Sequence, residues 1–414
     1  MKNKISQIIP IVPIVPIVTI VTIATLSLTG CYREPPLHLY DEDNPAVALP
    51  WIDLRLDLYW DYGLNLGINY DWRAEWYYGK CGQEGGWDSE DMRLFGELEY
   101  VEPTNFFIRR YFTGDVPYGT RLKKRDAYVT EKIFHAPYDW GFWDILAWND
   151  VKTIDDVYSL HFREPQSLDE DITAYTNQTM YSSRYHAPRY QNSFYEPEQL
   201  FSACERGIDI NRDLTGFTYD EEKDIWVRRL NMLLEPITYI YLPQVILHHN
   251  ISPLTHMRRI CPDDEGTTQI CDANLSGLAR STSLNTGISG TDAIAVKFRM
   301  RQKLDMDMNG ETVDIVGGRL MTFGICGQNG NRITRAEENT DKEHHYLDVN
   351  MRFYNGMDST FVFDVTDQVR KRYKGGVITV ELDMDTVPVP QHPGGSGFNA
   401  VVKGFDEVSH EIEL

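Results

Sequence analysis

The amino-acid sequence predicts an all-β protein, and three observations lead to this class. Apolar and charged residues alternate from Trp51 onward, as they do in a strand with one buried face. Asn309-Gly310, the strongest short hairpin signal, lies between two long segments rich in β-branched residues. Further strand-like segments with turn signals at short spacing fill the second half, which shows almost no helical periodicity. We therefore expect β-sandwich architecture.

The first 31 residues resemble a bacterial lipoprotein signal. Two lysines precede an apolar run over residues 8–28, and the run ends in Leu-Thr-Gly-Cys at Cys31. A spanning helix is the alternative, because the run is about long enough to cross a membrane. Three prolines within it argue against a helix, since each removes a backbone hydrogen bond. The resemblance implies a signal peptide over residues 1–30, acylation of Cys31 and a lipid-anchored protein of the cell outer membrane.

The length and charge of the chain limit its organisation and its partners. A chain of 414 residues exceeds what one hydrophobic core usually serves, so we expect two domains. Its formal net charge of −22 repels nucleic acid and anionic lipid, which leaves proteins, glycans and metal cations as partners. Residues 31–50 have little to bury and are expected to be a tether.

Strand patterns place the two expected domains at residues 51–222 and 223–414, because an acidic stretch ending at Glu222 precedes a new run of strands. In the aromatic-rich first half, strands are expected over residues 105–111, 127–134 and 157–162, and a short helix at 195–201. In the second half, strands are expected over residues 237–247, 294–308, 311–323, 346–354, 360–365 and 376–382. Pro243 restricts the first of these to an edge or a bulge.

Cysteine spacing suggests one disulfide. Cys261 and Cys271 bracket a polar loop and are the pair expected to form it. With Cys31 acylated, the number of remaining cysteines is odd, so at least one is expected to stay reduced or to pair between chains. No pairing is assigned to the other three, which are Cys81, Cys204 and Cys326.

Few motifs suggest chemistry, and we expect a protein that is no enzyme and uses no cofactor. Residues 305–310 match the first half of a calcium loop, but Val316 stands where the loop needs a bidentate acid, so we expect a hairpin. The pairs His248-His249 and His344-His345 are expected to bind no metal, since neighbouring strand residues point to opposite faces. No nucleophile elbow or phosphate loop occurs in the sequence.

Aromatic residues of the first half suggest an alternative function. Flat rings interleaved with acids and glycines can stack on a sugar and hydrogen-bond its hydroxyls. The residues expected to do so are Trp76, Tyr77, Trp140 and Trp143. Burial in the core of a sandwich explains the same residues and is the favoured interpretation.

Several blocks of the second half resemble a known family. They include Leu-Glu-Pro-Ile-Thr-Tyr-Ile-Tyr from Leu234, Asn-Leu-Ser-Gly-Leu-Ala-Arg-Ser from Asn274, Phe-Asp-Val-Thr-Asp-Gln-Val from Phe363 and Gly-Gly-Val-Ile-Thr-Val-Glu-Leu-Asp from Gly375. Such blocks are similar to those of Bacteroidales surface lipoproteins of the fimbrillin superfamily, particularly anchor-like subunits. The resemblance implies two tandem transthyretin-like β-sandwich domains. It also implies fimbrial subunit proteins as partners, bound by β-strand addition.

Overall fold

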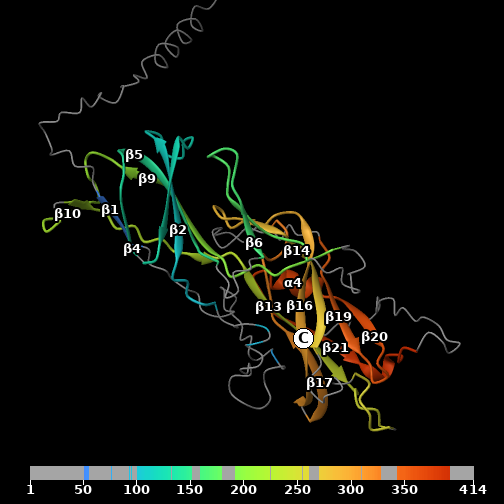
Figure 1. The fold of residues 1–414 in the computed structure, drawn as a ribbon. Helices are drawn as coiled ribbons and strands as arrows, with labels where there is room; N and C mark the ends of the chain where they lie inside the picture. Colours follow the sequence, from blue (N-terminus) through green and yellow to red (C-terminus); the bar gives the residue numbers. More distant parts are fainter. Residues whose placement is uncertain are drawn as a thin grey trace, which may run out of the picture. The chain divides into compact units, whose positions relative to one another are not determined.

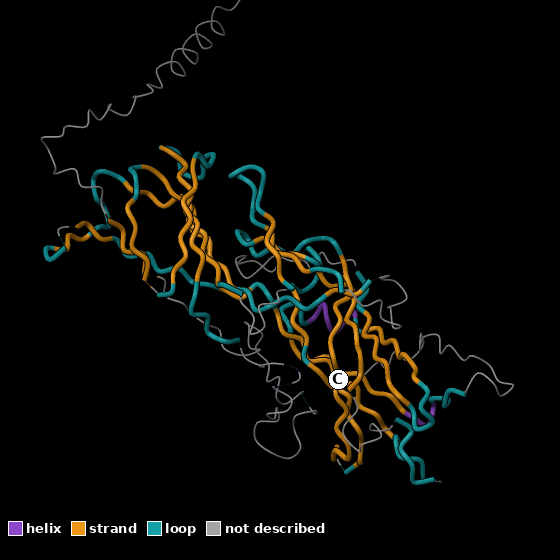
Figure 2. The backbone as a smooth tube through the Cα atoms, viewed as in Figure 1, coloured by secondary structure: helices purple, strands orange, loops and turns teal. Residues whose placement is uncertain are grey.

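A computed structural model of the chain describes the following residues: 51–55, 76, 93, 95, 100–131, 133–151, 159–179, 192–223, 225–253, 255–260, 270–308, 310–327 and 343–391. Within these ranges the regular secondary structure is almost entirely β-strand, with loops between the strands (Figures 1 and 2). The helical residues are Arg93, Phe95, one short α-helix, α4 (Thr366–Lys371), and one 3-10 turn, η1 (Met384–Thr386). The all-β prediction is confirmed.

A five-stranded antiparallel sheet lies in the first half of the described chain. Its strand order is β12 (Glu235–Pro236), β9 (Phe201–Ile210), β5 (Gly141–Asn149), β2 (Phe106–Gly114) and β3 (Lys123–Val129). Both faces of its central strands are apolar. In β5, Trp143 and Ile145 join one apolar cluster, whereas Leu146 and Trp148 join another, as the period of two requires.

A nine-stranded sheet forms the second half. Along its main path the order is β18 (Leu320–Thr322), β13 (Tyr239–His248), β17 (Glu311–Gly318), β16 (Ala293–Met308), β14 (Ile270–Ala279), β19 (Tyr346–Arg352) and β20 (Asp358–Asp364). In addition, β21 (Gly376–Asp383) pairs in parallel with β13, and β8 (Ser193–Phe194) pairs in parallel with β16. Every residue of β13 except its last is buried, so this strand contributes to cores on both of its faces.

Three smaller groups of strands complete the fold. Strand β1 (Trp51–Arg55) pairs with β4 (Ile133–Pro137), and β10 (Thr218–Asp220) pairs with β11 (Ile225–Val227). A third sheet has the order β15 (Ser281–Ser283), β7 (Thr173–Thr176) and β6 (Leu160–Arg163). Because β15 belongs to the second half and the other two strands to the first, this sheet links the halves. The division at residue 222 stays a prediction.

Two local predictions are wrong. The strand expected over residues 127–134 is two strands, because β2 begins at Phe106 and offers no partner beyond Val129. The helix expected at 195–201 is absent: residues 195–200 are non-helical and β9 begins at Phe201. Tertiary hydrogen bonds fix this segment, since Glu196 accepts one from the Met321 amide at 2.9 Å and Glu198 one from the Leu160 amide at 2.9 Å.

Pro243 lies in the interior of the sheet, at an interruption of pairing. Strand β13 pairs with β18 up to Tyr241 and with β17 from Gln244, so Pro243 stands where one partner strand replaces the other. The expected edge position is therefore wrong, whereas the expected irregularity is present. A residue without an amide proton is tolerated where the ladder is already interrupted.

The hairpin at Asn309-Gly310 is confirmed. Met308 pairs with Glu311, and Gly310 has a φ of +89°, a conformation that glycine adopts without strain. The two acids of the calcium-like motif serve the fold. Asp307 accepts a hydrogen bond from the Gly310 amide at 2.8 Å, and Asp305 forms an ion pair with Arg258.

One buried acid makes the stability of the fold depend on pH. Asp348 in β19 is 1% exposed, and neither of its carboxylate oxygens has a hydrogen-bond partner. Burial raises the pKa of Asp348 to about 7 from an ordinary value of 3.8. The folded state thus favours the protonated acid. Its stabilising contribution is complete below pH 4 and is lost as pH rises through 7.

We predict that Asp348→Asn raises the free energy of unfolding at pH 8 by roughly 2–4 kcal/mol and changes it little at pH 4, because an amide keeps the shape without the charge. Urea unfolding between pH 4 and pH 8 measures the difference. Asp115→Asn, at an exposed loop position, is the control and should leave the pH profile unchanged. Equal profiles for wild type and Asp348→Asn would contradict the prediction.

Candidate functional site beside an edge strand

A cavity of about 610 Å³ opens over one face of the five-stranded sheet. Its floor comes from β2, β3 and β5, and one wall comes from the segment that contains β6 and β7. The lining residues are Phe107, Ile108, Arg109, Asp126, Ala127, Tyr128, Trp148, Asp150, Val151, Leu160, Phe162, Glu164 and Ile172. The site combines apolar surface with a few converging polar groups, as ligand pockets usually do.

Three aromatic rings form the floor of the cavity. Phe107 stacks on Trp148 with ring centroids 5.5 Å apart and an interplanar angle of 20°, and it contacts Tyr128 at 4.9 Å. The three residues come from neighbouring strands, and the cross-strand pairs Phe107–Tyr128 and Phe107–Trp148 place them on one face. The result is a continuous aromatic surface that leads to the edge of the sheet.

Arg109 lies at the polar side of the cavity and is held between two carboxylates. Its guanidinium donates to both oxygens of Asp126, at 2.6 and 2.9 Å, and to both oxygens of Glu164, at 2.7 and 2.9 Å. Burial works to lower the pKa of Arg109, but the hydrogen bonds to Glu164 and Asp126 outweigh it and raise this pKa. The pKa of Glu164 is lowered, chiefly by its hydrogen bond to Arg109. The charged side of the pocket is therefore rigid and ionised.

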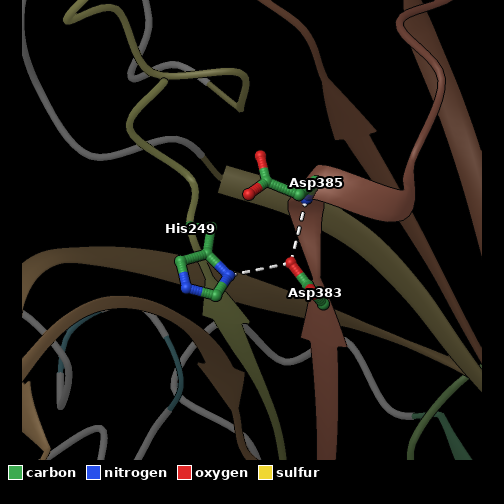
Figure 3. Close-up of side chains that lie close together, drawn as sticks. All are labelled: His249, Asp383 and Asp385. Atoms are coloured by element: carbon green, nitrogen blue, oxygen red, sulfur yellow. Dashed lines mark hydrogen bonds and ion pairs between the residues drawn. The ribbon is translucent and has the colours of Figure 1, made fainter. Parts of the chain in front are cut away.

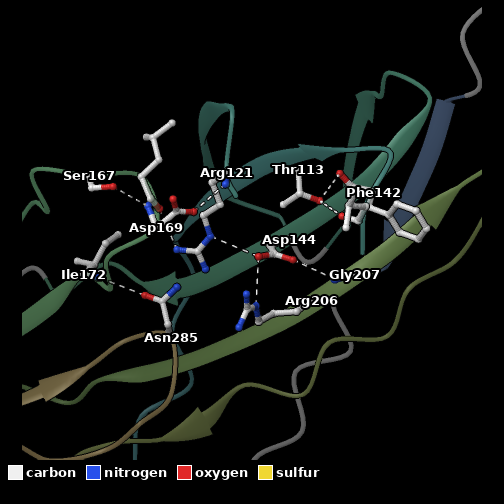
Figure 4. Close-up of polar contacts among 12 residues, drawn as sticks. Thr113, Arg121, Phe142, Asp144, Ser167, Asp169, Ile172, Arg206, Gly207 and Asn285 are labelled. Carbon is white, nitrogen blue, oxygen red and sulfur yellow. Dashed lines mark hydrogen bonds and ion pairs between the residues drawn. The ribbon is translucent and has the colours of Figure 1, made fainter. Parts of the chain in front are cut away.

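The wall of the cavity is fixed to the sheet by a buried ion pair (Figure 4). Asp144 of β5 is completely buried and contacts Arg121 at 3.3 Å and Arg206 at 3.2 Å. It also accepts a hydrogen bond from the Gly207 amide at 2.9 Å. Arg121 in turn reaches the segment between β6 and β7, donating from its side chain to the Leu168 carbonyl at 3.0 Å and from its backbone amide to Asp169 at 2.7 Å.

A second contact holds the same wall from the other half of the chain. The Ile172 amide donates to the side chain of Asn285 at 3.1 Å (Figure 4), and β7 pairs with β15. The segment that carries Leu160, Phe162 and Ile172 is therefore fastened at two places. A wall held in this way pre-forms the cavity, and pre-formed sites lose less entropy on binding.

Strand β3 forms one margin of the site and one edge of the sheet. Among the strands that the structure describes, it pairs only with β2. Along β3 the residues are alternately half-buried and exposed, and exposed Asp126 and Tyr128 line the cavity. An extended segment added along β3 would direct alternate side chains toward the cavity, because side chains of a strand alternate between faces.

The tryptophans expected to bind a sugar lie elsewhere. Trp143 is completely buried and contacts Phe112 and Tyr138, and its indole nitrogen donates to the Asp139 carbonyl at 2.9 Å. Trp76 is 3% exposed and Trp140 packs, partly buried, against the same apolar cluster. Tyr77 lies outside the described residues. The aromatic surface of this fold is instead made by Phe107, Tyr128 and Trp148.

The lipidation and disulfide predictions remain untested. Cys31 and Cys261 lie outside the described residues, and Cys271 is buried in β14. Burial and the nearby Asp272 raise the pKa of Cys271 above its usual range. Within the part of the chain described here, no helix is both long enough and apolar enough to cross a membrane.

The two histidine pairs have different surroundings. His345 is buried, with Nδ1 3.1 Å from the Ser276 carbonyl oxygen, as expected of a histidine satisfied in the core. His344 is exposed. For His248 and His249, the expectation that neighbouring side chains point to opposite faces of a strand is wrong. His249 follows the end of β13 with a φ of +51°, so both imidazoles lie near Glu311, with closest distances of 3.0 Å from His248 and 3.9 Å from His249.

Sequence reasoning missed the residues of the cavity. The strand expected over residues 105–111 carries Phe107 and Arg109 two positions apart, so both side chains lie on one face. This spacing is the signal in the sequence that points to the cavity. The partner carboxylate Glu164 comes from beyond β6, 55 residues along the chain, and nothing local in the sequence indicates this pairing. The position of the site beside an edge strand requires the strand order, which a single sequence does not supply.

No protein-family model and no curated protein matches the chain. Solved structures that resemble it include a candidate adhesin of Bacteroides ovatus (14% identity, 84% of this chain and 95% of that chain, TM-score 0.45). A candidate adhesin of Bacteroides thetaiotaomicron also resembles it (9% identity, 82% of this chain and 93% of that chain, TM-score 0.39). So does the fimbrial anchor protein Mfa2 of Porphyromonas gingivalis (12% identity, 69% of this chain and 83% of that chain, TM-score 0.32). Because their TM-scores are below 0.5, the fold assignment rests on the strands themselves.

We predict that Asp144→Ala lowers the free energy of unfolding by about 3–5 kcal/mol, because it leaves the buried guanidinium of Arg121 without its charge partner. Lys223→Ala is the matched control. It removes an exposed ion pair with Asp220 and should cost less than about 1 kcal/mol. Chemical unfolding measures both, and limited proteolysis should cut the Asp144→Ala variant within residues 163–172. Equal losses of stability in the two variants would contradict the structural role of Asp144.

Proposed function

We propose that this chain is a lipid-anchored cell-surface protein of the outer membrane that anchors or assembles fimbriae. It binds a fimbrial subunit by β-strand addition, and β3 is the receiving edge. The observation that carries the proposal is the pre-formed cavity beside β3, an edge strand with a single partner among the described strands. The lipoprotein-like signal and the family resemblance of the sequence support the surface location and the class of partner.

The geometry suits recognition of an extended segment. The backbone of β3 supplies hydrogen bonds along the added strand, and the cavity receives an apolar side chain that projects from it. Phe107 and Trp148 provide the apolar contact area. The carboxylates of Asp126 and Glu164, already engaged by Arg109, fix the polar boundary of the pocket and so set the register of the added strand.

Such a role requires binding and positioning and no chemical step. Arg109 is ionised and makes four hydrogen bonds to Asp126 and Glu164, so its task is structural. An anchor needs a lipid, a tether and one receptive sheet edge. The predicted acylated Cys31 and residues 31–50 would supply the first two, and β3 would supply the third.

A photo-crosslinking experiment tests the position of the receiving edge. We predict that benzoyl-phenylalanine at Tyr128 in β3 crosslinks to a fimbrial subunit on cells, whereas the same residue at Tyr219 in β10 does not. The two tyrosines have the same exposure of 46%, so accessibility does not distinguish them. Crosslinks of equal yield at both positions, or at Tyr219 alone, would contradict β3 as the receiving edge.

A gene deletion and a Cys31→Ala variant in the same cells test the anchor role itself. Deleting the gene should move fimbriae from the cell surface to the medium, and Cys31→Ala should do the same while releasing the protein from membranes. Unchanged number, length and attachment of fimbriae in the deletion strain would contradict the anchor function. If attachment is lost but Tyr128 fails to crosslink, the function stands and the binding edge lies elsewhere.

The cavity also favours a second candidate function, the binding of a glycan. Stacked Phe107 and Trp148 beside paired carboxylates provide a flat apolar face and hydrogen-bond acceptors, which a sugar requires. We predict that a glycan array would then show specific binding that Tyr128→Ala abolishes, because Tyr128 is the exposed aromatic residue of the lining. Trp143→Ala and Trp148→Ala are unsuited as tests, because both residues are buried in apolar clusters and emptying such a site costs about 3–5 kcal/mol of stability. Binding that persists in the Tyr128→Ala variant would place any glycan site outside this cavity.

A further inference from the structure

A group of metal-ligand side chains lies at the far end of the β13–β21 pair (Figure 3). His249 follows β13, Asp383 is the last residue of β21, and Asp385 lies in the 3-10 turn η1. One ligand atom from each of these three side chains lies within 4.8 Å of the other two. The three residues come from two segments that are more than one hundred positions apart in the chain.

The local backbone turns the three side chains toward one another. His249 has a φ of +51°, which directs its ring out of the strand and toward β21. Its Nδ1 lies 2.9 Å from Oδ1 of Asp383, and the same oxygen accepts a hydrogen bond from the Asp385 amide at 3.0 Å. The carboxylate of Asp385 lies on the same side as the imidazole (Figure 3).

The surroundings of this group are strongly acidic. Glu311 lies 3.9 Å from Nε2 of His249, and Glu381 lies 3.6 Å from Nε2 of His248. Arg259 contacts Asp385 at 2.7 Å and is the cation facing these acids in the described contacts. Four carboxylates thus gather beside two imidazoles and one guanidinium, a charge balance that attracts a divalent cation.

One further observation indicates ligand capacity. The Nε2 atom of His248 is buried and makes no hydrogen bond, whereas its Nδ1 lies 3.0 Å from Glu311. A buried imidazole nitrogen without a hydrogen-bond partner is uncommon in folded proteins. It lies 3.6 Å from the carboxylate of Glu381, which places a second imidazole and a further acid near the three ligands.

We propose that His249, Asp383 and Asp385 bind a divalent first-row transition cation such as Zn²⁺, with Glu311 beside them to complete the coordination. Imidazole together with carboxylate oxygen is a donor set that suits zinc. Ligands of a tetrahedral zinc ion with bonds near 2.0–2.1 Å are about 3.3 Å apart. The 2.9 Å between His249 and Asp383 is therefore already close to the spacing that the ion requires.

The bound ion would join two segments of the chain at one end of the nine-stranded sheet. It would connect the residue after β13 to the end of β21 and the adjoining turn η1. Without the ion, this connection is made by the contact between the His249 and Asp383 side chains and by the hydrogen bond from the Asp385 amide to Asp383. A ligand that binds only the folded state stabilises it in proportion to its saturation. Zinc is thus expected to raise the melting temperature without changing the fold.

The test is calorimetric titration of the purified full-length chain with ZnCl₂ and, separately, with CaCl₂ after removal of metals by EDTA. We predict saturable zinc binding at this group and at least tenfold weaker calcium binding. His249→Gln and Asp383→Asn should each weaken zinc binding at least tenfold. His344→Gln is the matched control, because His344 is 57% exposed beside Asp364, as His249 is 54% exposed beside Asp383.

Two measurements keep the result interpretable. The melting temperature without metal shows whether each variant folds. X-ray absorption spectroscopy at the zinc edge shows whether the ion has one or two imidazole ligands in addition to oxygen ligands. Loss of binding in folded His249→Gln with retention in His344→Gln supports the site. Absence of saturable zinc binding by the wild-type chain overturns the proposal, as does undiminished binding in both His249→Gln and Asp383→Asn.

Discussion

The burial of β13 on both faces is the constraint on which the rest of the fold depends. Ile240, Leu242 and Ile246 belong to an apolar cluster that also takes side chains from the five-stranded sheet. Tyr241, Val245 and Leu247 belong to a second cluster, which is enclosed by β14, β16, β19 and α4. A strand in this position cannot slip by one residue, because a slip would exchange the two sets of side chains between cores of different shape.

Fixing this strand also fixes the features at its two ends. Just before its start, the Thr238 carbonyl accepts a hydrogen bond from the Tyr100 hydroxyl at 2.6 Å. This bond holds the chain between β13 and β12, and β12 is an outer strand of the five-stranded sheet. At its other end, the parallel partner β21 brings Asp383 to His249. The edge-strand cavity and the histidine–aspartate group thus lie on a common framework, although they use different chemistry.

Elements with strong local signals were predictable from the sequence, and elements set by distant contacts were not. The hairpin around Gly310 and the strands β19, β20 and β21 follow from alternation and turn residues. The segment from Tyr195 has a helix-like start, but two glutamates that bind distant backbone amides hold it extended. The candidate cavity escaped prediction for the same reason, since Arg109 and Glu164 meet only through the packing of β6 over the sheet.

The charge of the β3 edge has a consequence for selectivity. This strand begins with Lys123, Lys124 and Arg125, in a chain whose net charge is −22. Two copies of so acidic a protein repel one another at long range, and charged residues on an edge strand discourage indiscriminate pairing. These cations pair with carboxylates of the same chain, Lys123 and Arg125 with Asp139 and Lys124 with Glu164. In the proposed function, an incoming strand with acidic residues at this end would compete for these cations, and the attraction would favour its encounter and its register. A receiving edge of this kind would discriminate by charge before any backbone hydrogen bond formed.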